Sequence, residues 1–286
     1  MPELPEVETI RSYLDSVLAG KAIMSVPHLD DRMVKRSLKN GAEIRAALVG
    51  QTFGSVRRRG KFLLLGLASS PDALMIHLGM SGRLVTESLD APYRPHTHLV
   101  VRYSGGELRL SDPRRFGRIA WVESGGLWGP HLGMEPLSSA FSSKTLGEIL
   151  KGRKVAIKSA LLNQNLVAGL GNIYADEALF YAGIHPQRPA GSLDVDELKR
   201  LVRGIRAVLR RSIEHRGTSF SDYVDALGHP GENQGYLKVY GREGKACRRC
   251  GTPIQRQVVG GRSSHYCPHC QRLTETSSEG AHHAEI

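Results

Sequence analysis

The first regular pattern in the chain is helical. Between residues 3 and 20 the apolar side chains recur every three or four positions, so they share one face of an α-helix. This face consists of Val7, Ile10, Leu14, Val17 and Leu18. Glu3 and Pro5 suit the first turn, where the helix dipole favours a carboxylate and proline loses no hydrogen bond. We therefore predict a helix over residues 3–20, ended by Gly20.

From about residue 50 to residue 123 the apolar period shortens to that of β-strands. Short segments rich in Val, Leu and Ile are separated by turn residues, and Ser104, Gly105 and Gly106 suit a hairpin turn. The predicted strands are residues 61–67, 73–78, 97–103, 107–111 and 117–122. The first half is therefore predicted to be a β-sandwich or flattened barrel, with the N-terminal helix packed on it.

The second half returns to a helical pattern. Gly129, Pro130 and residues 135–138 indicate a link, after which helices are predicted over residues 144–150, 156–167, 173–182 and 194–214. Residues 217–236 are polar and contain four glycines, which predicts a long flexible loop. Residues 274–286 are small, polar and without a pattern, which predicts a disordered tail.

The charge of the chain narrows its partners. The formal net charge is +11, from 39 Lys and Arg against 28 Asp and Glu, which favours nucleic acid, an anionic membrane or an acidic protein. Basic clusters recur at residues 57–59, 114–115, 151–158 and 248–249, so a phosphate-tracking surface is favoured over scattered solubilising charge. No apolar run approaches the roughly 20 residues of a membrane span. With no secretory signal either, we expect a cytoplasmic protein without a membrane partner.

All four cysteines lie in one short module. Cys247 and Cys250 form one CxxC knuckle, and Cys267 and Cys270 form a second one 16 residues later. This spacing is typical of a zinc site, and four thiolates suit a closed, tetrahedral, structural Zn²⁺. A redox CxxC pair and inert buried thiols are the weaker alternatives. The arm between the knuckles is predicted to form a ribbon that could present Arg256 and Arg262 to phosphates, although surface arginines are common in any basic protein.

The N-terminal string MPELPEVE offers a nucleophile. Once Met1 is removed, Pro2 carries the chain's α-amine, a group with a pKa of about 7.7–8.0 in peptides against about 10.4 for lysine. A secondary amine of this kind can form an iminium ion with a sugar C1′. The alternative is that proline and glutamates only begin a helix, and the residues alone favour that alternative.

A resemblance to a known family changes this assessment. The strings PELPEVE, GKFLLL, HLGMSG, SDPRRFG, LGMEPLS, AIKSALLNQ and GLGNIYADEALF, with the four-cysteine module, resemble formamidopyrimidine-DNA glycosylase, in the family's order over residues 1–271. The resemblance implies an α+β fold: an N-terminal β-sandwich with an N-terminal helix, then a helical helix–two-turn–helix domain and a zinc ribbon. The predicted domains are residues 1–138 for catalysis, 139–236 for DNA binding, 237–272 for zinc and 273–286 for the tail.

The resemblance also implies catalytic roles, position by position. Pro2 matches the nucleophile that attacks C1′ of the damaged nucleotide, and Glu3 matches the acid that protonates the sugar or base. Glu6 lies beside them and is included in the catalytic set. Lys61 matches a lysine that contacts phosphate and assists β-elimination. Arg262 matches the ribbon arginine that grips the lesion's phosphate and assists δ-elimination.

Further positions match DNA contacts of the family. Met80, Arg114 and Phe116 match the wedge that fills the gap left by an everted base, with Arg114 on the orphaned cytosine. The expected phosphate contacts are His96, Arg153, Lys158 and Asn172. Taken singly, each position has a structural alternative: Lys61 as a solvated strand residue, Met80 and Phe116 as core, Asn172 as a helix cap.

The implied function is a bifunctional DNA glycosylase and abasic-site lyase for oxidised purines such as 8-oxoguanine. Its expected partner is duplex DNA with the lesion opposite cytosine, and the enzyme is expected to be a nucleoid-associated monomer with one structural Zn²⁺. Two alternatives stay open: an endonuclease VIII-like glycosylase for oxidised pyrimidines, and a non-catalytic zinc-ribbon DNA-binding protein. The central string GHPGENQGY of the loop 217–236 leaves the lesion preference open.

Overall fold

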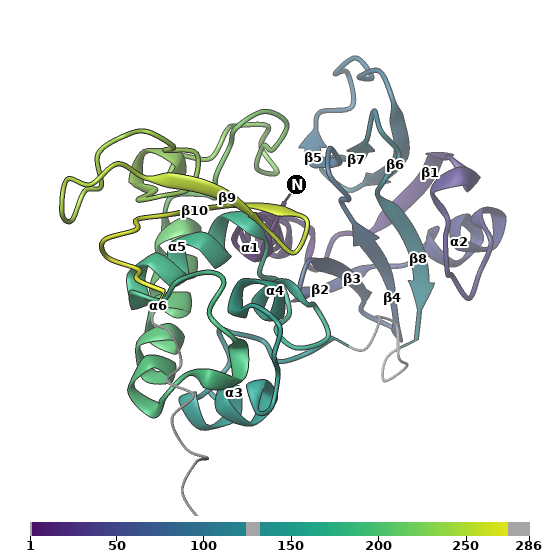
Figure 1. Cartoon of the computed structure of the whole chain (residues 1–286). Coiled ribbons are helices and arrows are strands. Elements are labelled where there is room, and N and C mark those ends of the chain that lie inside the picture. Colours follow the sequence, from purple (N-terminus) through teal and green to yellow (C-terminus); the bar gives the residue numbers. More distant parts are fainter. Residues whose placement is uncertain (1, 124–131, 274–286) are drawn as a thin grey trace, which may run out of the picture. The chain divides into compact units, whose positions relative to one another are not determined.

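The computed structural model describes residues 2–123 and 132–273, in two compact units. The first unit combines residues 1–138, 163–171 and 206–237, and the second combines residues 139–162, 172–205 and 238–286. In Figure 1 the first unit contains the large strands and the second contains most of the helices and the yellow hairpin. Each unit is therefore assembled from segments far apart in the sequence.

The first unit is built on two four-stranded antiparallel sheets, each in its own spatial order. One sheet has the order β1 (Ile23–Leu29), β6 (Thr97–Tyr103), β7 (Gly106–Ser111) and β5 (Arg83–Glu87). The other has the order β2 (Phe53–Arg59), β3 (Phe62–Leu67), β4 (Ser70–His77) and β8 (Arg118–Val122). The predicted β-sandwich is confirmed, and the predicted turn joins β6 to β7.

The N-terminal helix contributes directly to the core of this unit. Helix α1 (Leu4–Leu18) begins after Glu3, and its side chains Val7, Ile10, Leu14 and Leu18 belong to one apolar cluster with residues of both sheets. Burying such a side chain stabilises the fold by about 1.5–3 kcal/mol. The predicted helix is therefore confirmed, and the element that carries the N-terminus is fixed by the core.

Several elements of the first unit were not predicted. Strands β1, β2 and β5, the helix α2 (Gly41–Leu48) and the short helix η1 (Asp31–Met33) fall in segments that the hydrophobic pattern left unassigned. Strand β2 ends in three arginines and β1 contains Pro27, so neither has a clean alternation of apolar and polar residues. These strands are recognisable only from their pairing with β3 and β6.

The second unit is mainly helical. Its helices are α3 (Ser143–Leu150), α4 (Ile157–Leu162), α5 (Asn172–Ala182) and the start of α6 (Val195–Glu214), with the short helix η2 (Ala190–Ser192). Helix α4 is shorter than the predicted residues 156–167. It stops before Asn163, whose carbonyl and side-chain oxygens accept hydrogen bonds from the backbone of the following turn. Strands β9 (Gln255–Val259) and β10 (Arg262–Tyr266) form the predicted ribbon.

The segment 217–236 packs as part of the first unit. Its only helix is the short η3 (Asn233–Tyr236), and it contains no strand. The backbone N–H of Thr218 donates to Glu6 of α1, and the hydroxyl of Tyr223 donates to the carbonyl of Arg216. This segment is therefore tied to the helix that carries the N-terminus.

Two sequence predictions fall where the structure gives no description. The predicted tail, residues 274–286, and the Gly129–Pro130 link lie outside the described residues. Within the described part of the chain, no helix is both long and apolar enough to cross a membrane.

Candidate active site and zinc centre

The first turn of α1 is held against a glycine-rich turn of the first unit. Pro2 and Glu3 are buried, and the N–H of Leu4 donates to the carbonyl of Gly169 at 3.0 Å. One carboxylate oxygen of Glu3 accepts the N–H of Gly171 at 2.8 Å. These bonds fix the predicted nucleophile and the predicted acid side by side on one rigid backbone.

Gly171 is in direct contact with the predicted acid. A Cβ atom at this position would lie 2.3 Å from Cδ and 2.5 Å from a carboxylate oxygen of Glu3, closer than real contacts allow. Only glycine lets the backbone approach the carboxylate in this way. Nothing in the sequence pattern indicates that Gly171 contacts a residue 168 positions earlier.

Glu6 joins the N-terminus to the segment 217–236. Its side chain is 1% exposed, and its two oxygens accept the N–H groups of Glu3 and Thr218, each at 2.8 Å. Tyr223 packs beside it, and burial, assisted by the charge of Glu6, raises the pKa of the Tyr223 hydroxyl well above its usual range. Glu6 therefore acts in the structure as a buried connector between two parts of the predicted site.

Lys61 lies in a braced turn between β2 and β3. The N–H of the preceding Gly60 donates to Glu135, which also forms ion pairs with Arg58 at 3.0 Å and Arg59 at 3.1 Å. Lys61 itself is 8% exposed, so it is not the solvated strand residue of the structural alternative. The turn holds this lysine in one place instead of leaving it free in water.

His77, at the end of β4, is a site candidate that sequence reasoning missed. Its ring lies 4.7 Å from that of Phe62, and its Nδ1 atom accepts the N–H of Gly79. Burial, followed by the charges of Arg118 and Lys61, lowers the pKa of His77 to about 4. The imidazole is therefore neutral near pH 7. A protonated imidazole would be repelled by the neighbouring charges of Arg118 and Lys61.

His77 gives the protein a specific pH dependence. Because the pKa is about 4 in the folded chain and near 6.5 in the unfolded chain, the unfolded chain binds the proton first as the pH falls. The stability from this residue is present above pH 6.5 and is lost towards pH 4, by about 3 kcal/mol. His77→Asn keeps an acceptor for Gly79 but does not titrate. Urea unfolding at pH 7 and pH 4 should show a smaller loss in the variant, and an equal loss would contradict the assignment.

The predicted wedge residues are exposed. Met80 is 38% exposed and Phe116 55%, so the alternative that both belong to the core is wrong. The guanidinium of Arg114 lies over the Phe116 ring at 4.8 Å from its centroid. Buried Asp112 accepts the hydroxyl of Ser81 at 2.6 Å and the N–H of Gly117 at 2.8 Å, which ties the two wedge loops together.

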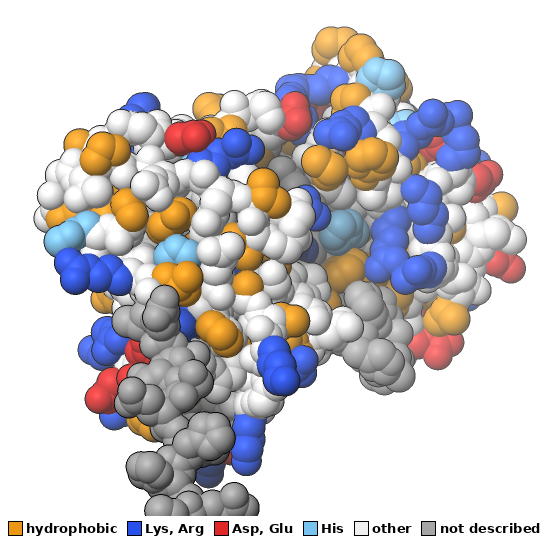
Figure 2. Space-filling model, in the orientation of Figure 1, with side chains coloured by type: hydrophobic (Ala, Val, Ile, Leu, Met, Phe, Trp, Pro, Cys, Tyr) orange, Lys and Arg blue, Asp and Glu red, His pale blue; other side chains and the backbone are white. Residues whose placement is uncertain are grey.

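Basic side chains lie in and beside this wedge. In the view of Figure 2, Lys and Arg side chains gather over the β6 and β8 side of the first unit, while Asp and Glu side chains lie mostly at its rim. Lys35, which sequence reasoning missed, bonds the carbonyl of Arg115 at 3.2 Å. Exposed cations in the wedge or beside it include Arg114, Arg115 and Lys35. Such a surface suits a DNA backbone.

The other predicted DNA contacts differ in exposure. His96 is exposed in the first unit, and Arg153 and Arg262 are exposed in the second. Asn172 begins α5, its Nδ2 atom lies 3.4 Å from the Ser263 hydroxyl, and its buried Oδ1 atom has no hydrogen-bond partner among the residues that the structure describes. Lys158 is fully buried, with its ammonium group 2.6 Å from Asp176. Lys158 is therefore closed to solvent, unlike Arg153 and Arg262.

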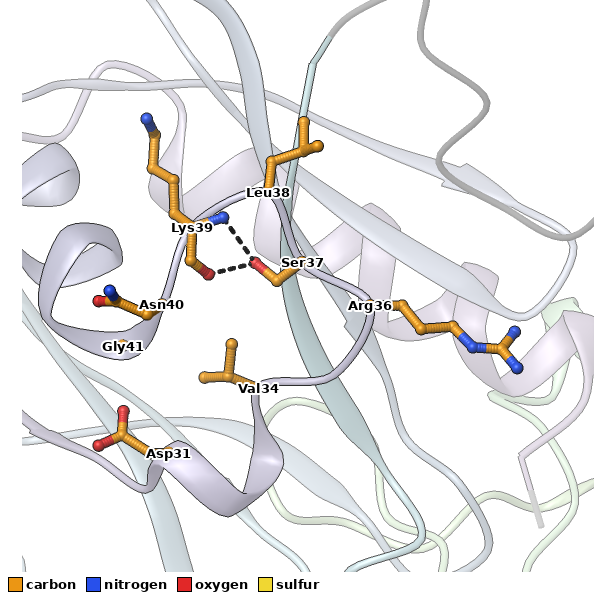
Figure 3. A pocket seen from close by; sticks show the side chains of 8 residues that line it. All are labelled: Asp31, Val34, Arg36, Ser37, Leu38, Lys39, Asn40 and Gly41. Atoms are coloured by element: carbon orange, nitrogen blue, oxygen red, sulfur yellow. Dashed lines mark hydrogen bonds between the residues drawn. The ribbon is translucent and has the colours of Figure 1, made fainter.

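A separate pocket opens between η1 and α2. Its volume is about 330 Å³, and Figure 3 shows the Ser37 hydroxyl bonded to both the N–H and the carbonyl of Lys39 at its wall. The lining residues are Asp31, Val34, Arg36, Ser37, Leu38, Lys39, Asn40 and Gly41. None of the site residues predicted from the sequence is among them, so this pocket has no part in the predicted site.

The four cysteines converge in the second unit. One sulfur atom from each of Cys247, Cys250, Cys267 and Cys270 lies within 4.8 Å of the others. A tetrahedral Zn²⁺ with Zn–S bonds of about 2.3 Å needs sulfurs roughly this close. The N–H groups of Arg249 and Cys270 point at the sulfurs of Cys247 and Cys267 at 3.4 Å, which stabilises thiolates. The residues present therefore fit a closed structural zinc site.

Loss of one zinc ligand should unfold the ribbon alone. Cys267 is 0% exposed and is central to the cluster, and a small metal module takes most of its folding free energy from the metal. Cys267→Ser is expected to lower the zinc content from one per chain towards zero and to abolish DNA binding. The fluorescence of Trp121, buried in β8 of the first unit and measured in a Trp128→Phe background, should be unchanged. A variant that keeps one tightly bound zinc per chain would contradict the site.

Models of known protein families match three successive parts of the chain. A model of the formamidopyrimidine-DNA glycosylase N-terminal domain matches residues 1–119, and one of the H2TH domain of that family matches residues 132–224. A model of the zinc finger found in FPG and IleRS matches residues 244–273. Together with the cysteine cluster, the last match confirms the predicted structural zinc.

Full-length relatives carry the same name. The chain is 45% identical over 275 residues to a formamidopyrimidine-DNA glycosylase of Herpetosiphon aurantiacus, covering 95% of this chain and 100% of the relative. It is 47% identical over 280 residues to that of Symbiobacterium thermophilum, covering 96% and 90%. A Lactococcus lactis FPG variant solved with Fapy-dG-containing DNA superposes with a TM-score of 0.88 at 37% identity, covering 95% and 100%. On this evidence the chain belongs to the formamidopyrimidine-DNA glycosylase family.

Proposed function

We propose that this chain excises oxidised purine bases from duplex DNA and then cleaves the strand, with Pro2 as the nucleophile. The observation that carries the proposal is the buried pair Pro2 and Glu3 at the start of α1. The N–H of Gly171 fixes the carboxylate of Glu3, the residue that follows Pro2. Family membership supports the reaction class. Related Lactococcus lactis Fpg has been solved with Fapy-dG DNA and with abasic-site DNA.

The first chemical step joins the enzyme to the sugar. The nitrogen of Pro2, once freed of Met1, bonds to C1′ while the bond from C1′ to the base breaks. Opening of the sugar ring then gives an iminium ion. Two protons are needed, one at O4′ and one on the departing base. The amine N–H releases one, and Glu3, when protonated, delivers the other.

The second step uses the iminium ion as an electron sink. A proton leaves C2′, its electron pair moves into the iminium, and the C3′–O bond breaks to release a phosphate. Lys61, held in its braced turn, assists this β-elimination beside the phosphate. Loss of a further proton then breaks the C5′–O bond, and exposed Arg262 neutralises the departing phosphate in this δ-elimination.

The everted state is stabilised by the wedge. Met80 and Phe116 fill the space that the base leaves, and Arg114 hydrogen-bonds the orphaned cytosine. His96, Arg153 and Asn172 bind phosphates, which helps to offset the few kcal/mol that extrusion of a base costs. The proposal includes a preference for lesions opposite cytosine, a monomeric state and a location at the nucleoid. Sedimentation of the free protein tests the monomer.

Arg114→Ala is expected to reduce discrimination between cytosine and adenine opposite the lesion. A good bidentate contact to a base contributes about 1–3 kcal/mol of discrimination, which is roughly 5- to 150-fold in rate or affinity. The ratio of excision rates for 8-oxoguanine in the two pairs should fall towards one. Arg94→Ala, an exposed arginine paired with Glu87, is the control and should keep the ratio. Unchanged discrimination in Arg114→Ala would move the readout to another residue.

Borohydride trapping tests the reaction class. Protein mixed with an 8-oxoguanine duplex and sodium borohydride should give a covalent adduct, because reduction of the iminium makes the bond permanent. An undamaged duplex of the same sequence should give none. DNA binding without any adduct or cleavage would support the non-catalytic alternative and overturn the proposal.

Oxidised pyrimidines are a second candidate substrate class. One solved Lactococcus lactis Fpg complex contains DNA with an oxidised pyrimidine, so the fold can accept such a lesion in that protein. Competition between 8-oxoguanine and thymine glycol duplexes separates the two classes. Faster excision of thymine glycol would make the pyrimidine the preferred substrate.

A further inference from the structure

A buried ion pair anchors the ribbon that carries Arg262. The ammonium group of Lys158, in α4, lies 2.6 Å from a carboxylate oxygen of Asp176, in α5, and both side chains are 0% exposed. The same ammonium group donates to the backbone carbonyl of Ser263 at 2.5 Å. Ser263 directly follows Arg262 in β10, so this contact is one residue away from the predicted phosphate grip.

Asp176 holds the next two residues of the same strand. Its carboxylate accepts the hydroxyl of Ser264 at 3.1 Å and the N–H of His265 at 2.8 Å. With the Lys158 bond, the pair therefore contacts three consecutive residues of β10. The hairpin turn also lies close to α4, because a Cβ at Gly260 would be 2.3 Å from the hydroxyl of Ser159.

The zinc module is fastened to α5 at a second place. The carboxylate of Glu177 accepts the N–H groups of Lys238, Val239 and Tyr240 at 2.8–2.9 Å, and burial raises its pKa. Those bonds hold the chain entering the module, whereas Asp176 and Lys158 hold the strand after the hairpin turn. The hairpin turn itself contains Gly260 and Gly261, so without the Lys158 contact Arg262 would sit at the end of a pliable loop.

Stability alone does not account for such a pair. Taking two charges out of water costs several kcal/mol per ion, and apolar replacements of buried pairs are often as stable or more stable. A fixed geometry is what the pair supplies, since each charged group binds backbone or side-chain atoms of one short stretch. These contacts account for the complete burial of Lys158, whereas the predicted phosphate contact Arg153 is exposed.

We propose that Lys158 and Asp176 are positioning residues that fix Arg262 for δ-elimination, and that Lys158 makes no direct contact with DNA phosphate. This inference rests on the proposed function, because it assigns the pair to the step in which Arg262 neutralises the departing phosphate. A displacement on the order of 1 Å can lower the rate of a positioned group about 100-fold. Loss of the pair should therefore slow δ-elimination selectively.

The ratio of δ- to β-elimination products on a preformed abasic-site duplex tests the inference. Lys158→Met keeps the apolar stem and leaves Asp176 bonded to Ser264 and His265. It should lower the product ratio as Arg262→Ala does, up to about 100-fold, and the double variant should be no lower than Arg262→Ala. Lys199→Met, an exposed lysine of α6, is the control and should keep the wild-type ratio.

The salt dependence of DNA binding distinguishes positioning from direct contact. Each phosphate contact contributes about one to the slope of log affinity against log salt. Under the positioning model the double variant Lys158→Met/Arg262→Ala loses about one, the same as Arg262→Ala alone. A loss of about two, or a product ratio that falls further in the double variant, makes Lys158 an independent phosphate contact and overturns the inference.

Folding and the proposed function are checked separately. Because removal of one partner leaves the other charge buried and unpaired, the melting temperature is expected to fall, and a zinc content of one per chain with a cooperative thermal transition above the assay temperature shows that a variant is folded. If Lys158→Met fails this check, the same ratio is measured in Asp176→Asn, which is nearly isosteric. A wild-type product ratio in a folded variant, or in Arg262→Ala, overturns the inference. Failure of the proposed function looks different, because then the wild-type protein itself gives neither adduct nor strand cleavage.

Discussion

Gly171→Ala is expected to abolish base excision while the protein stays folded. The added Cβ would lie 2.3 Å from Cδ of Glu3, and the end of that side chain moves more easily than the backbone. The carboxylate then loses the N–H of Gly171 and its place beside Pro2. A positioned acid or base contributes about 10²–10⁴-fold, so single-turnover excision of 8-oxoguanine should fall by roughly that factor.

Cleavage at a preformed abasic site should survive the same substitution, because no base has to be expelled there. Glu3→Gln should show the same division between the two substrates. Gly147→Ala in α3 is the matched control, since its nearest neighbour is the flexible end of Leu198 and alanine favours a helix. Excision at the wild-type rate by Gly171→Ala would show that the position of the Glu3 carboxylate is not critical.

Local sequence patterns predicted the helices and strands whose apolar side chains lie on one face. Helix α1 was predictable because its apolar side chains recur with the period of a helix and fill the core. The zinc site was predictable because both knuckles are short and local in the sequence. Strand β2 was not, since Arg57, Arg58 and Arg59 mask its alternation, and two of these arginines pair with Glu135 far along the chain.

The site residues that the sequence missed act through distant contacts. Gly171 is defined by its approach to Glu3, and Asp112 by its bond to Ser81. Neither partner is visible from spacing, because the pairs are 168 and 31 residues apart. His77 lies within a recognised string, yet its neutral state depends on burial and on Lys61 and Arg118. Such features follow from tertiary packing, which a single sequence does not display.

For Lys158 the sequence suggested a role but could not give the position of the side chain. Its string, AIKSALLNQ, resembles the family, and that resemblance implied a phosphate contact for this lysine. Burial depends on which helix face meets the rest of the unit, and α4 is too short for its periodicity to settle that. The position of its ammonium group between Asp176 and Ser263 could come only from the fold.

Removal of Met1 is expected to control all covalent chemistry of this protein. Pro2 is buried beside Glu3, and only a free α-amine has the lone pair that attacks C1′. Mass spectrometry of active protein should therefore show that Met1 is absent. Pro2→Gly keeps a free amine, but a primary one, and base removal should be impaired because the secondary amine gives an iminium that stays cationic without protonation.

The decisive comparison uses two preparations that differ only at Met1. Protein made without methionine aminopeptidase keeps the amide bond to Pro2, whose nitrogen then has no nucleophilic lone pair, so borohydride should trap no adduct. Binding to an abasic-site duplex should persist, because the exposed cations and the zinc ribbon are unchanged. Treatment of that preparation with the aminopeptidase should restore trapping. Full excision by protein that demonstrably retains Met1 would require another nucleophile and would rule out Pro2.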